Sequence, residues 1–433
     1  MHARPILQAQ RKNDSLKDAD PCGLSCCRLD SAAVIYLDYN ATTPVAPEVL
    51  EAMMPYLTCE WGNPSSAYKF GAKLKTVIET ARAQVAELIG AQSRDVIFTS
   101  CATESNNAAI HAALKANPGK RHIVTSAVEH SSVLNYCMAL EGNSPFASRS
   151  SGRESAPSAS PEVQSRLTSA ATGQGEGYRV TYLPVDRDGL LKLADLESAI
   201  TDETAVVSLM WANNETGVLF PVKEIAGICR ARGVLYHCDA VQAAGKVTID
   251  VSRDGAVQAD YLSLTGHKFH APKGVGALYV RRKAPFSPMI HGGHQERNLR
   301  GGTECVPLIV GLVKAAELAR KHLPSYEQKV RPLRDALEEG ILGSIPNTEL
   351  NGHTLRGLTN RSNAMSRKLT LTTLRNRAYS RPSDAGNKRI PTRAALGARY
   401  VRRNVRSHQG WPAFRSQTHP GRSGVARLGC TTI

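Results

Sequence analysis

The stretch YLSLTGHK at residues 261–268 decides the fold, because an apolar run ends there directly in a histidine and a lysine. A second apolar run, VLYHC at 234–238, ends in the same way in Asp239, with Gln242 close behind it. Runs this apolar are typical of strands that are buried on both faces of a parallel sheet. Ligands of such sheets bind at the carboxyl ends of the strands. We therefore expect Asp239 and Lys268 to lie side by side at one edge of a buried sheet.

Further apolar runs extend this pattern over most of the chain, and helix-like stretches separate most of them. Strands that alternate with helices predict an α/β protein with a mainly parallel, seven-stranded sheet and a smaller second domain. The predicted strands are Val96–Thr99, His122–Ser126, Arg179–Leu183, Ala205–Trp211, Val234–Cys238, Tyr261–Leu264 and Val275–Val280, and examples of the predicted helices are Ala72–Leu88, Leu190–Ile200 and Val222–Arg232.

Three other strand ends carry polar groups at the same edge. His130 and Asn214 each follow a predicted strand, and a helix that begins with Ala102 and Thr103 follows another. Taken singly, these are ordinary features: a structural histidine, a turn, and a helix start. Taken together, they indicate a ligand site, because a helix start binds anions and a histidine can stack on a ring and relay protons.

The pair of Asp239 and Lys268 indicates which ligand this site binds. Each has an ordinary explanation, since Asp239 could cap a helix and Lys268 could be a surface lysine. However, a lysine at the carboxyl end of an apolar strand is partly desolvated and can bond covalently to an aldehyde. A carboxylate for a pyridinium nitrogen and a lysine for an aldehyde are what pyridoxal 5'-phosphate requires. The pair therefore predicts this cofactor.

The net charge of +16 suggests a polyanion as partner, but its distribution does not support one. Residues 355–433 hold 17 of the 54 Lys and Arg and 1 of the 38 Asp and Glu, so the rest of the chain balances at 37 of each. Nucleic acid is therefore not expected as a partner of the main body. No apolar run approaches the roughly 20 residues that a membrane helix needs, so we expect no membrane span.

Cysteine usage and the N-terminus favour a cytoplasmic protein. The ten cysteines include no CxxC pair and no cluster with zinc-ligand spacing, which indicates reduced thiols and no metal site. An apolar signal segment is missing from the N-terminal residues, which also carry several aspartates. Both properties argue against a secretory signal or a transit peptide.

Composition and periodicity divide the chain into segments. Residues 1–33 show no periodicity and are predicted to be a loose extension. Residues 34–352 show the alternating apolar runs and helix-like stretches of a packed α/β protein. A stretch rich in Ser, Gly, Ala and Pro interrupts them at 142–177. We expect this stretch to be a flexible surface insertion. Residues 353–433 are a basic, aperiodic tail.

A series of short motifs between residues 34 and 352 resembles the class V aminotransferase family, and within it the cysteine desulfurases of the NifS type. The resemblance implies the fold type I of pyridoxal phosphate enzymes. The motifs are YLDYNATT at 36–43, WGNPSS at 61–66, ATESNN at 102–107, VEHSS at 128–132, NNETG at 213–217, HCDAVQ at 237–242, GHK at 266–268, GGHQER at 292–297 and GGTE at 301–304.

The resemblance implies a role for each matching residue. Lys268 and His130 would be the catalytic residues, with Lys268 bound covalently to the cofactor and His130 stacked on its ring. Asp239 would pair with the pyridine nitrogen, and Gln242 and Asn214 would contact the side of the phenolic oxygen. The residues implied around the cofactor phosphate are Ala102, Thr103, Thr265, His267 and Thr303, the last from the partner subunit of a homodimer. Gly266 is implied as a further cofactor-binding residue. Two departures are mild: Thr265 stands where the family usually has Ser, and Cys101 replaces a common Gly.

The same resemblance implies an activity and its partners. The enzyme would take sulfur from L-cysteine and give L-alanine and an enzyme-bound persulfide. A scaffold protein for iron–sulfur cluster assembly would accept the sulfur, either for nitrogen fixation or for general use. A selenocysteine lyase and an inactive cofactor-binding scaffold are the alternatives, and a nucleic-acid-binding module that uses the Arg-rich tail is a third.

The tail departs from the family pattern. Family members carry there a nucleophilic cysteine in a Ser/Gly-rich loop and an arginine that binds the substrate carboxylate. Neither motif is recognisable after Gly352, where Cys430 is the only cysteine. The sequence of the tail is rich in Arg and almost free of Asp and Glu. This composition favours translation in a shifted reading frame, and a genuine basic tail is the competing interpretation.

Overall fold

The structure is a computed structural model, and everything it describes belongs to one unit of the chain, residues 1–379. The predicted extension at 1–33, nearly all of the predicted insertion at 142–177 and most of the predicted tail lie outside the described residues. The described residues are 36–142, 177–252, 254–353, 356–359, 364–366 and 369–370.

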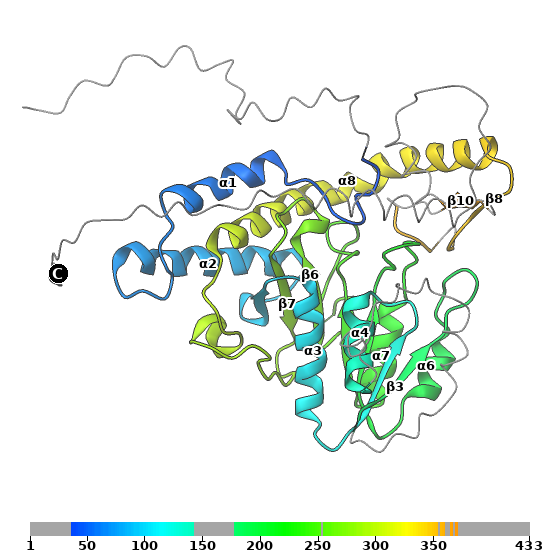
Figure 1. The fold of residues 1–433 in the computed structure, drawn as a ribbon, viewed down its shortest axis with the longest axis horizontal. Coiled ribbons are helices and arrows are strands. Elements are labelled where there is room, and N and C mark those ends of the chain that lie inside the picture. Colours follow the sequence, from blue (N-terminus) through cyan, green and yellow to red (C-terminus); the bar gives the residue numbers. More distant parts are fainter. Residues whose placement is uncertain are drawn as a thin grey trace, which may run out of the picture. The chain divides into compact units, whose positions relative to one another are not determined.

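Seven strands form the central sheet in the order β1-β7-β6-β5-β4-β2-β3. Figure 1 labels β3, β6 and β7 among them. The run from β6 to β3 is parallel, whereas β7 is antiparallel to both of its neighbours, β6 and β1. The prediction of a mainly parallel seven-stranded sheet is therefore confirmed. The strands are β1 (Val96–Thr99), β2 (His122–Ser126), β3 (Arg179–Leu183), β4 (Thr204–Met210), β5 (Leu235–Asp239), β6 (Tyr261–Thr265) and β7 (Gly276–Val280).

The predicted strands agree with the observed ones to within one residue at each end. The shift that concerns function is at β5, which includes Asp239 instead of ending before it. Asp239 stays in the sheet because its main chain pairs with Met210 of β4 and with Ser263 of β6. Its carboxyl group therefore projects from a rigid strand and not from a loop.

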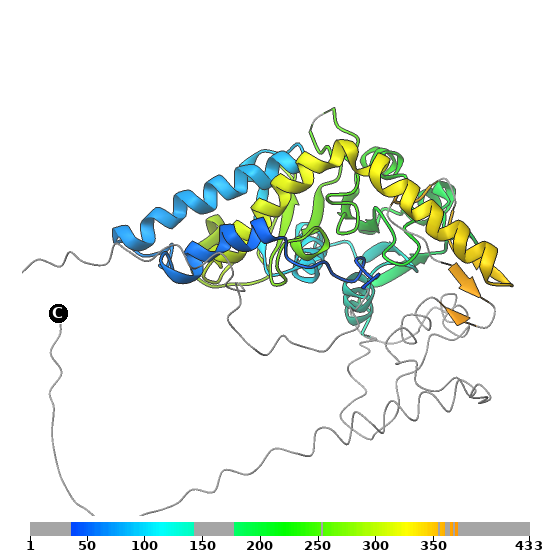
Figure 2. The same ribbon diagram turned by 90° about the horizontal axis from the view of Figure 1, so that it is seen from above.

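Helices cover both faces of this sheet. The core on one face includes residues of α1, α2, α6, α7 and α8, and the core on the other face includes residues of α3 and α4. Figure 2 shows the yellow helix α8 and the cyan helices on opposite sides of the sheet. In the described part of the chain, no helix is long and apolar enough to span a membrane. The helices are α1 (Pro47–Thr58), α2 (Lys69–Leu88), α3 (Ala102–Ala116), α4 (Ser131–Leu140), α6 (Leu193–Ala199), α7 (Val222–Ala231) and α8 (Val306–Ser344).

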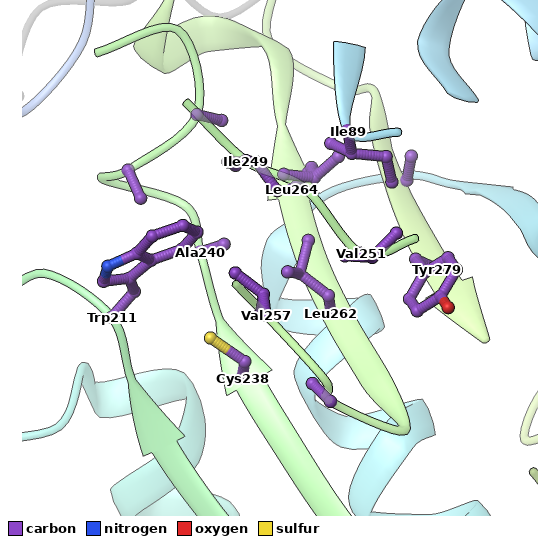
Figure 3. Close-up of a cluster of buried hydrophobic side chains, with 14 of the residues drawn as sticks. Ile89, Trp211, Cys238, Ala240, Ile249, Val251, Val257, Leu262, Leu264 and Tyr279 are labelled. Carbon is purple, nitrogen blue, oxygen red and sulfur yellow. The ribbon is translucent and has the colours of Figure 1, made fainter. Parts of the chain in front are cut away.

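Successive residues of the strands serve the two cores in turn. Leu262 belongs to the core beneath α8, whereas its neighbour Tyr261 belongs to the core beneath α3. This alternation follows from the two-residue period of a strand, and it explains why both positions are apolar in sequence. Figure 3 shows part of the first core, where Leu262 and Leu264 of β6 lie near Val257 and Ile89.

The long helix α8 belongs to this core only at its beginning. Its buried residues end at Ala316, Pro324 lies near the midpoint of the helix, and Pro332 lies within the second half. Leu333 and Leu337 in that half are 73% and 50% exposed. A small antiparallel sheet follows in the order β10-β9-β8. Its strands are β8 (Thr348–Leu350), β9 (Ala364–Ser366) and β10 (Leu369–Thr370).

The loop before α8 is anchored to the sheet by a buried ion pair. The guanidinium of Arg82 on α2 donates to the carboxylate of Glu296 (Nη2–Oε1 2.9 Å), and both side chains are 2% exposed. Glu296 also accepts from the main-chain N–H of Phe98 on β1 at 2.8 Å. The loop turns sharply at this point, because residues 296–298 all have positive φ.

A second ion pair ties the same loop to the start of α3. Arg300 donates to Glu104 (Nε–Oε1 2.9 Å), and Glu104 also accepts from the main-chain N–H and the hydroxyl of Ser100. Burial raises the pKa of Glu104, but these hydrogen bonds outweigh burial and hold the pKa below its ordinary value. The carboxylate is therefore ionised at neutral pH and fixes the turn between β1 and α3.

Candidate active site

The carboxyl ends of β5 and β6 form the centre of the site. β5 ends at Asp239, and β6 leads through Thr265 into a single 3-10 turn at Gly266–Lys268. Because the two strands are parallel neighbours, Asp239 and Lys268 leave the sheet at the same edge, as the sequence predicts. The turn needs a glycine at 266, since a Cβ there would lie 2.6 Å from the Cβ of Ala271.

Asp239 is a buried carboxylate with two specific partners. Its Oδ1 accepts from the main-chain N–H of Val241 at 3.0 Å, and its Oδ2 accepts from the side-chain amide of Asn106 at 2.8 Å. Burial raises the pKa of Asp239 above its ordinary value, and these two hydrogen bonds oppose that rise. A cation that approached the carboxylate would also favour its charged form.

Lys268 is held above this edge by the N-terminal segment. Its Nζ donates to the main-chain carbonyls of Asn40 at 2.7 Å and Ala41 at 3.0 Å. The side-chain amide of Gln242 donates to the same carbonyl of Asn40 at 3.1 Å. A cavity of about 380 Å³ lies beside them and is lined in part by Lys268, Asn40 and Lys246. The amine therefore reaches a space large enough for a small ligand.

His130 lies at the start of α4, where its side chain caps the helix. Its Nδ1 accepts from the main-chain N–H of Ser132 at 3.1 Å and lies 2.8 Å from the hydroxyl of Ser132. Most other residues near it are buried, but His130 itself is exposed. The ring is thus fixed at one nitrogen and open on the remainder of its surface.

Glu129, which precedes His130 in the sequence, has a buried carboxyl group. Oε1 of Glu129 accepts from the hydroxyl of Ser126 at 2.6 Å and from the main-chain N–H of Met210 at 3.0 Å. Burial raises the pKa of Glu129 to about 8, and the negative charge of Asp239 contributes to the rise. Glu129 is therefore largely protonated at neutral pH and joins the ends of β2 and β4 without adding a charge.

The start of α3 has the properties of an anion site. The helix begins at Ala102, and no side chain in the described part of the chain caps it at Cys101. Its first N–H groups therefore remain available to an anion, and Thr103 is exposed at the same turn. The sequence prediction places Ala102 and Thr103 at this position.

Two further residues predicted near the phosphate come from the end of β6. Burial, together with the positive charges of Lys268 and other lysines, lowers the pKa of His267 to about 4. Its ring is therefore neutral near pH 7, with Nδ1 3.2 Å from the hydroxyl of Thr42. The hydroxyl of Thr265 donates to the carbonyl of Val275 at 3.1 Å.

Two predicted residues are not drawn into this cluster by the contacts described. The side-chain amide of Asn214 donates to the carboxylate of Glu215 at 2.7 Å. Its neighbour Asn213 forms the turn, because its Oδ1 accepts from the main-chain N–H groups of Glu215 and Thr216. Thr303 is exposed in the loop before α8. Their roles toward the cofactor stay predictions.

Sequence reasoning missed the residues that support the predicted ones. Asn40, Asn106, Ser132 and Glu129 all lie within motifs that carry the family resemblance, but none was assigned a role. Only Asn106 gave a usable signal, because an asparagine that points inward from an apolar helix needs a buried partner. Asn40 gave none, since it acts through a main-chain carbonyl.

The thiols of the described residues fall into two groups. Cys137, Cys229 and Cys238 are buried, and burial raises the pKa of each. Cys59 and Cys305 are exposed, and Cys101 is half-buried. Cys430 in the tail lies outside the described residues. The described part of the chain contains no group of three or more His, Cys, Asp or Glu residues that could hold a metal ion.

This fold and this site define a class of protein. A mainly parallel seven-stranded sheet carries an acid at the end of β5, a lysine after β6 and an uncapped helix start after β1. This combination is the fold type I of pyridoxal phosphate enzymes, an α/β architecture.

The chain belongs to the class V aminotransferase family, whose sequence model matches residues 35–144 and 159–370. It is 48% identical over 331 residues to cysteine desulfurase 2 of Trichormus variabilis, covering 76% of this chain and 74% of that protein. It is 43% identical over 332 residues to the cysteine desulfurase NifS of Azotobacter vinelandii, with coverage of 76% and 74%.

Solved structures agree with this assignment. A NifS-like protein superposes with a TM-score of 0.67 at 34% identity, covering 79% of this chain and 84% of that chain. SspA in complex with cysteine superposes with a TM-score of 0.64 at 32% identity, covering 84% of this chain and 92% of that chain.

Proposed function

We propose that this protein is a pyridoxal-phosphate-dependent cysteine desulfurase. It takes sulfur from L-cysteine, giving L-alanine and an enzyme-bound persulfide that supplies iron–sulfur cluster assembly. The observation that carries the proposal is the pair of Asp239 and Lys268, which share one edge of the sheet, with Lys268 lining a cavity of about 380 Å³. The similarity to curated cysteine desulfurases supports the choice of substrate.

The residues of the site fit pyridoxal phosphate. Asp239 is a buried carboxylate with no lysine or arginine among the described ion pairs, so a pyridinium N–H would satisfy its charge. The uncapped N-terminus of α3 suits a phosphate, and neutral His267 can donate to one. The residues we expect to hold the cofactor are Lys268, Asp239, His130, Gln242, Asn214, Ala102, Thr103, Thr265, Gly266 and His267, with Thr303 from a second subunit.

When bound, pyridoxal phosphate supplies an electron sink for the charge that develops at the substrate Cα. Lys268 lies where its amine can move the proton at that Cα, because Nζ reaches the cavity from the end of β6. Asp239, whose carboxylate is fixed by Val241 and Asn106, would hold a proton on the ring nitrogen of the cofactor. His130 would stack on the ring and offer Nε2 for proton transfer, since its Nδ1 is occupied by Ser132.

The reaction also needs a thiolate that attacks the sulfur of the substrate. The family resemblance places this cysteine after Gly352, where the sequence offers only Cys430. Buried Cys137, Cys229 and Cys238 are poor candidates, since burial disfavours their thiolates. Because of its place in the family pattern, we assign the sulfur-accepting role first to Cys430, ahead of the exposed Cys59 and Cys305.

We further propose that the protein is a cytoplasmic homodimer that transfers sulfur to a scaffold protein. One face of α1 supports the dimer: Leu50, Met54 and Leu57 follow one another at helical spacing and are 51%, 44% and 52% exposed. Trp61, just beyond the helix, is 71% exposed. Apolar residues gathered in this way are typical of an interface.

The proposed function is tested by reconstituting the protein with pyridoxal phosphate and supplying L-cysteine. We expect alanine from L-cysteine and none from L-serine. The reason is that the enzyme thiolate can take the sulfur of cysteine as a persulfide but has no corresponding reaction with the hydroxyl of serine. A Lys268→Ala variant should form no alanine. If wild-type protein binds the cofactor and forms no alanine even with an added thiol as sulfur acceptor, the desulfurase proposal is wrong and a non-catalytic scaffold remains.

A further inference from the structure

Asn106 on α3 stands between the two groups that we assign to the cofactor ring. It is fully buried, and its Nδ2 lies 2.8 Å from Oδ2 of Asp239 and 2.8 Å from the hydroxyl oxygen of Ser132. Ser132 in turn contacts Nδ1 of His130 at 2.8 Å. One buried amide therefore connects Asp239 at the end of β5 with His130 at the start of α4.

The direction of each hydrogen bond in this chain follows from its chemistry. An ionised carboxylate only accepts, so the NH₂ group of Asn106 must face Asp239. Its second N–H then points to the hydroxyl oxygen of Ser132, which accepts it. The hydroxyl proton of Ser132 is consequently free to be donated to Nδ1 of His130.

The main chain fixes the same nitrogen independently. The N–H of Ser132 also donates to Nδ1 of His130 at 3.1 Å, so Nδ1 has to be the unprotonated nitrogen of the ring. A neutral His130 then carries its only proton on Nε2. Nε2 is the nitrogen that is not engaged by Ser132, on a side chain that is exposed.

The amide oxygen of Asn106 shows that these two hydrogen bonds of its NH₂ group have a cost in stability. Its Oδ1 is buried and has no hydrogen-bond donor among the described residues. An unpaired buried amide oxygen is unfavourable, and such groups in a folded protein call for an explanation. The two N–H donations of the same side chain supply one, because both serve residues at the candidate site.

We propose that Asn106 is a positioning residue that holds Asp239 toward the cofactor's ring nitrogen and, through Ser132, fixes His130 with its proton on Nε2. The part that concerns the ring nitrogen rests on the proposed function, whereas the state of His130 can be tested without cofactor. Neither Asn106 nor Ser132 need touch the cofactor for this role.

The test compares three variants of the full chain by two measurements that do not depend on turnover. The first is the dissociation constant of pyridoxal phosphate, obtained by titrating cofactor-free protein. The second is the ¹⁵N spectrum of histidine-labelled protein, in which the two ring tautomers give different patterns. A His130→Gln variant identifies the signal of His130. The variants are Asn106→Leu, Ser132→Ala and, as matched control on the same helix turn, Asn107→Ala.

We expect wild-type His130 to show protonated Nε2 and unprotonated Nδ1 in its neutral form. Asn106→Leu should weaken cofactor binding by about tenfold or more, because a hydrogen bond to a buried charged group is lost. Ser132→Ala should change the Nδ1 signal of His130 while leaving the dissociation constant within about threefold of wild type. Asn107→Ala should change neither, since its side-chain oxygen already lacks a partner in the described part of the chain.

A neutral His130 protonated on Nδ1 in wild-type protein would overturn the proposal, as would wild-type cofactor affinity in Asn106→Leu. If Asn106→Leu does not fold, Ser132→Ala decides: an unchanged His130 signal overturns the proposal, and a shifted one supports it. If wild-type protein binds no cofactor, the proposed function fails, and the tautomer of His130 still tests the role of Ser132.

Discussion

At the scale of single residues, the site is built from groups whose charge is set by burial. Burial raises the pKa of Asp239 and of Glu129, whereas it lowers the pKa of His267. Burial thus leaves Glu129 and His267 largely neutral near pH 7 and makes the ionised Asp239 dependent on its partners. A cofactor that carries both a cation and an anion suits such a site, because it brings the charges that burial removed.

The first prediction concerns Lys268. We expect the wild-type protein to carry the cofactor covalently and to show its visible absorbance, and Lys268→Ala to lose the covalent link. Lys246→Ala is the matched control, because Lys246 lines the same cavity and is held by Gln242 instead. Borohydride reduction followed by peptide mapping identifies the labelled lysine. Label on a lysine other than Lys268 would disprove the assignment.

The second prediction concerns the charge of Asp239. Asp239→Asn keeps the shape of the side chain but removes the carboxylate that we expect to hold a proton on the ring nitrogen. We expect exchange of the substrate Cα proton with solvent to slow by about 10²–10³-fold, as is typical when one key electrostatic partner is lost. Proton NMR in deuterated buffer measures the exchange. An Asn variant as fast as wild type excludes this role.

The third prediction is a pH dependence of stability that arises from Glu129. Its pKa is raised from 4.5 to about 8 on folding, chiefly by burial, so the folded state retains a proton that the unfolded state releases. This contribution to stability is fully present below the unfolded pKa and is lost as the pH rises through the folded pKa. We expect Glu129→Gln to remove a slope of up to about 1.4 kcal/mol per pH unit in that window.

Urea unfolding at a series of pH values between these two pKa values measures the slope. Gln keeps the oxygen that accepts from Ser126 and Met210, so the variant should fold. Glu224→Gln, on an exposed position of α7, serves as control and should leave the slope unchanged. A slope that persists in Glu129→Gln would mean that another group titrates.

At the scale of elements, the loop before α8 is fixed by charge instead of by apolar packing. Glu296 joins it to α2 and β1, and Arg300 joins it to the start of α3. The start of α3, where we expect the cofactor phosphate, is thereby tied to the loop that carries Thr303. Sequence motifs indicated the importance of this loop, but the pairing of Arg82 with Glu296 spans 214 positions and could not be read from spacing.

The fourth prediction tests this anchoring. Glu296→Gln leaves the buried Arg82 with only the exposed Glu79 as a carboxylate partner, and we expect the free energy of unfolding to fall by about 3–5 kcal/mol. Glu87→Gln is the control, because its pair with Arg320 is exposed on both sides and such pairs contribute about 0–1 kcal/mol. Urea unfolding at neutral pH compares the two. Equal effects would mean that burial of the pair is unimportant.

Periodicity and apolar runs predicted the strands, and with them the strand ends at which we expect the site residues, because strands depend on local pattern. Asp239, Lys268 and the start of α3 could be named as candidates because each lies at the end of a strand or within a few residues of it. The partners of these residues were not found, because Asn40 and Asn106 reach them across 228 and 133 positions. Contacts between distant segments depend on how elements pack, and no single stretch of sequence records that.

At the scale of the whole molecule, the residues that we assign to the cofactor all precede the basic tail. The family match ends at residue 370, and the tail beyond it lies outside the described residues. The described helix α8 exposes Leu333 and Leu337 just before the small sheet. Cofactor binding and sulfur acceptance are therefore expected to depend on different parts of the chain.

The fifth prediction follows from this separation. If the tail derives from a shifted reading frame, its like charges and lack of period do not support a packed domain, and it should be trimmed readily by protease. We then expect the protein to retain cofactor binding and Cα-proton exchange. Alanine formation from cysteine should be slow, because no thiol would be well placed to accept the sulfur. Limited proteolysis and an alanine assay test both parts together.

Two controls complete that experiment. Sequencing the gene around codon 354 tests the reading frame directly. Cys430→Ser tests the only thiol of the tail, and it should abolish whatever alanine formation the full chain shows. A protease-resistant tail with rapid turnover would mean that the tail is a genuine domain of unfamiliar sequence.

The pairing of β1 with β7 determines when the sheet can be completed during synthesis. Val96 pairs with Tyr279, so the first strand has no partner until the last one has left the ribosome. Pairing across such a separation is slow and leaves apolar edges open to aggregation in the meantime. However, β7 ends at Val280, well before the tail begins. A nascent chain whose reading frame shifts after codon 354 can therefore still pair β1 with β7 and complete its sheet.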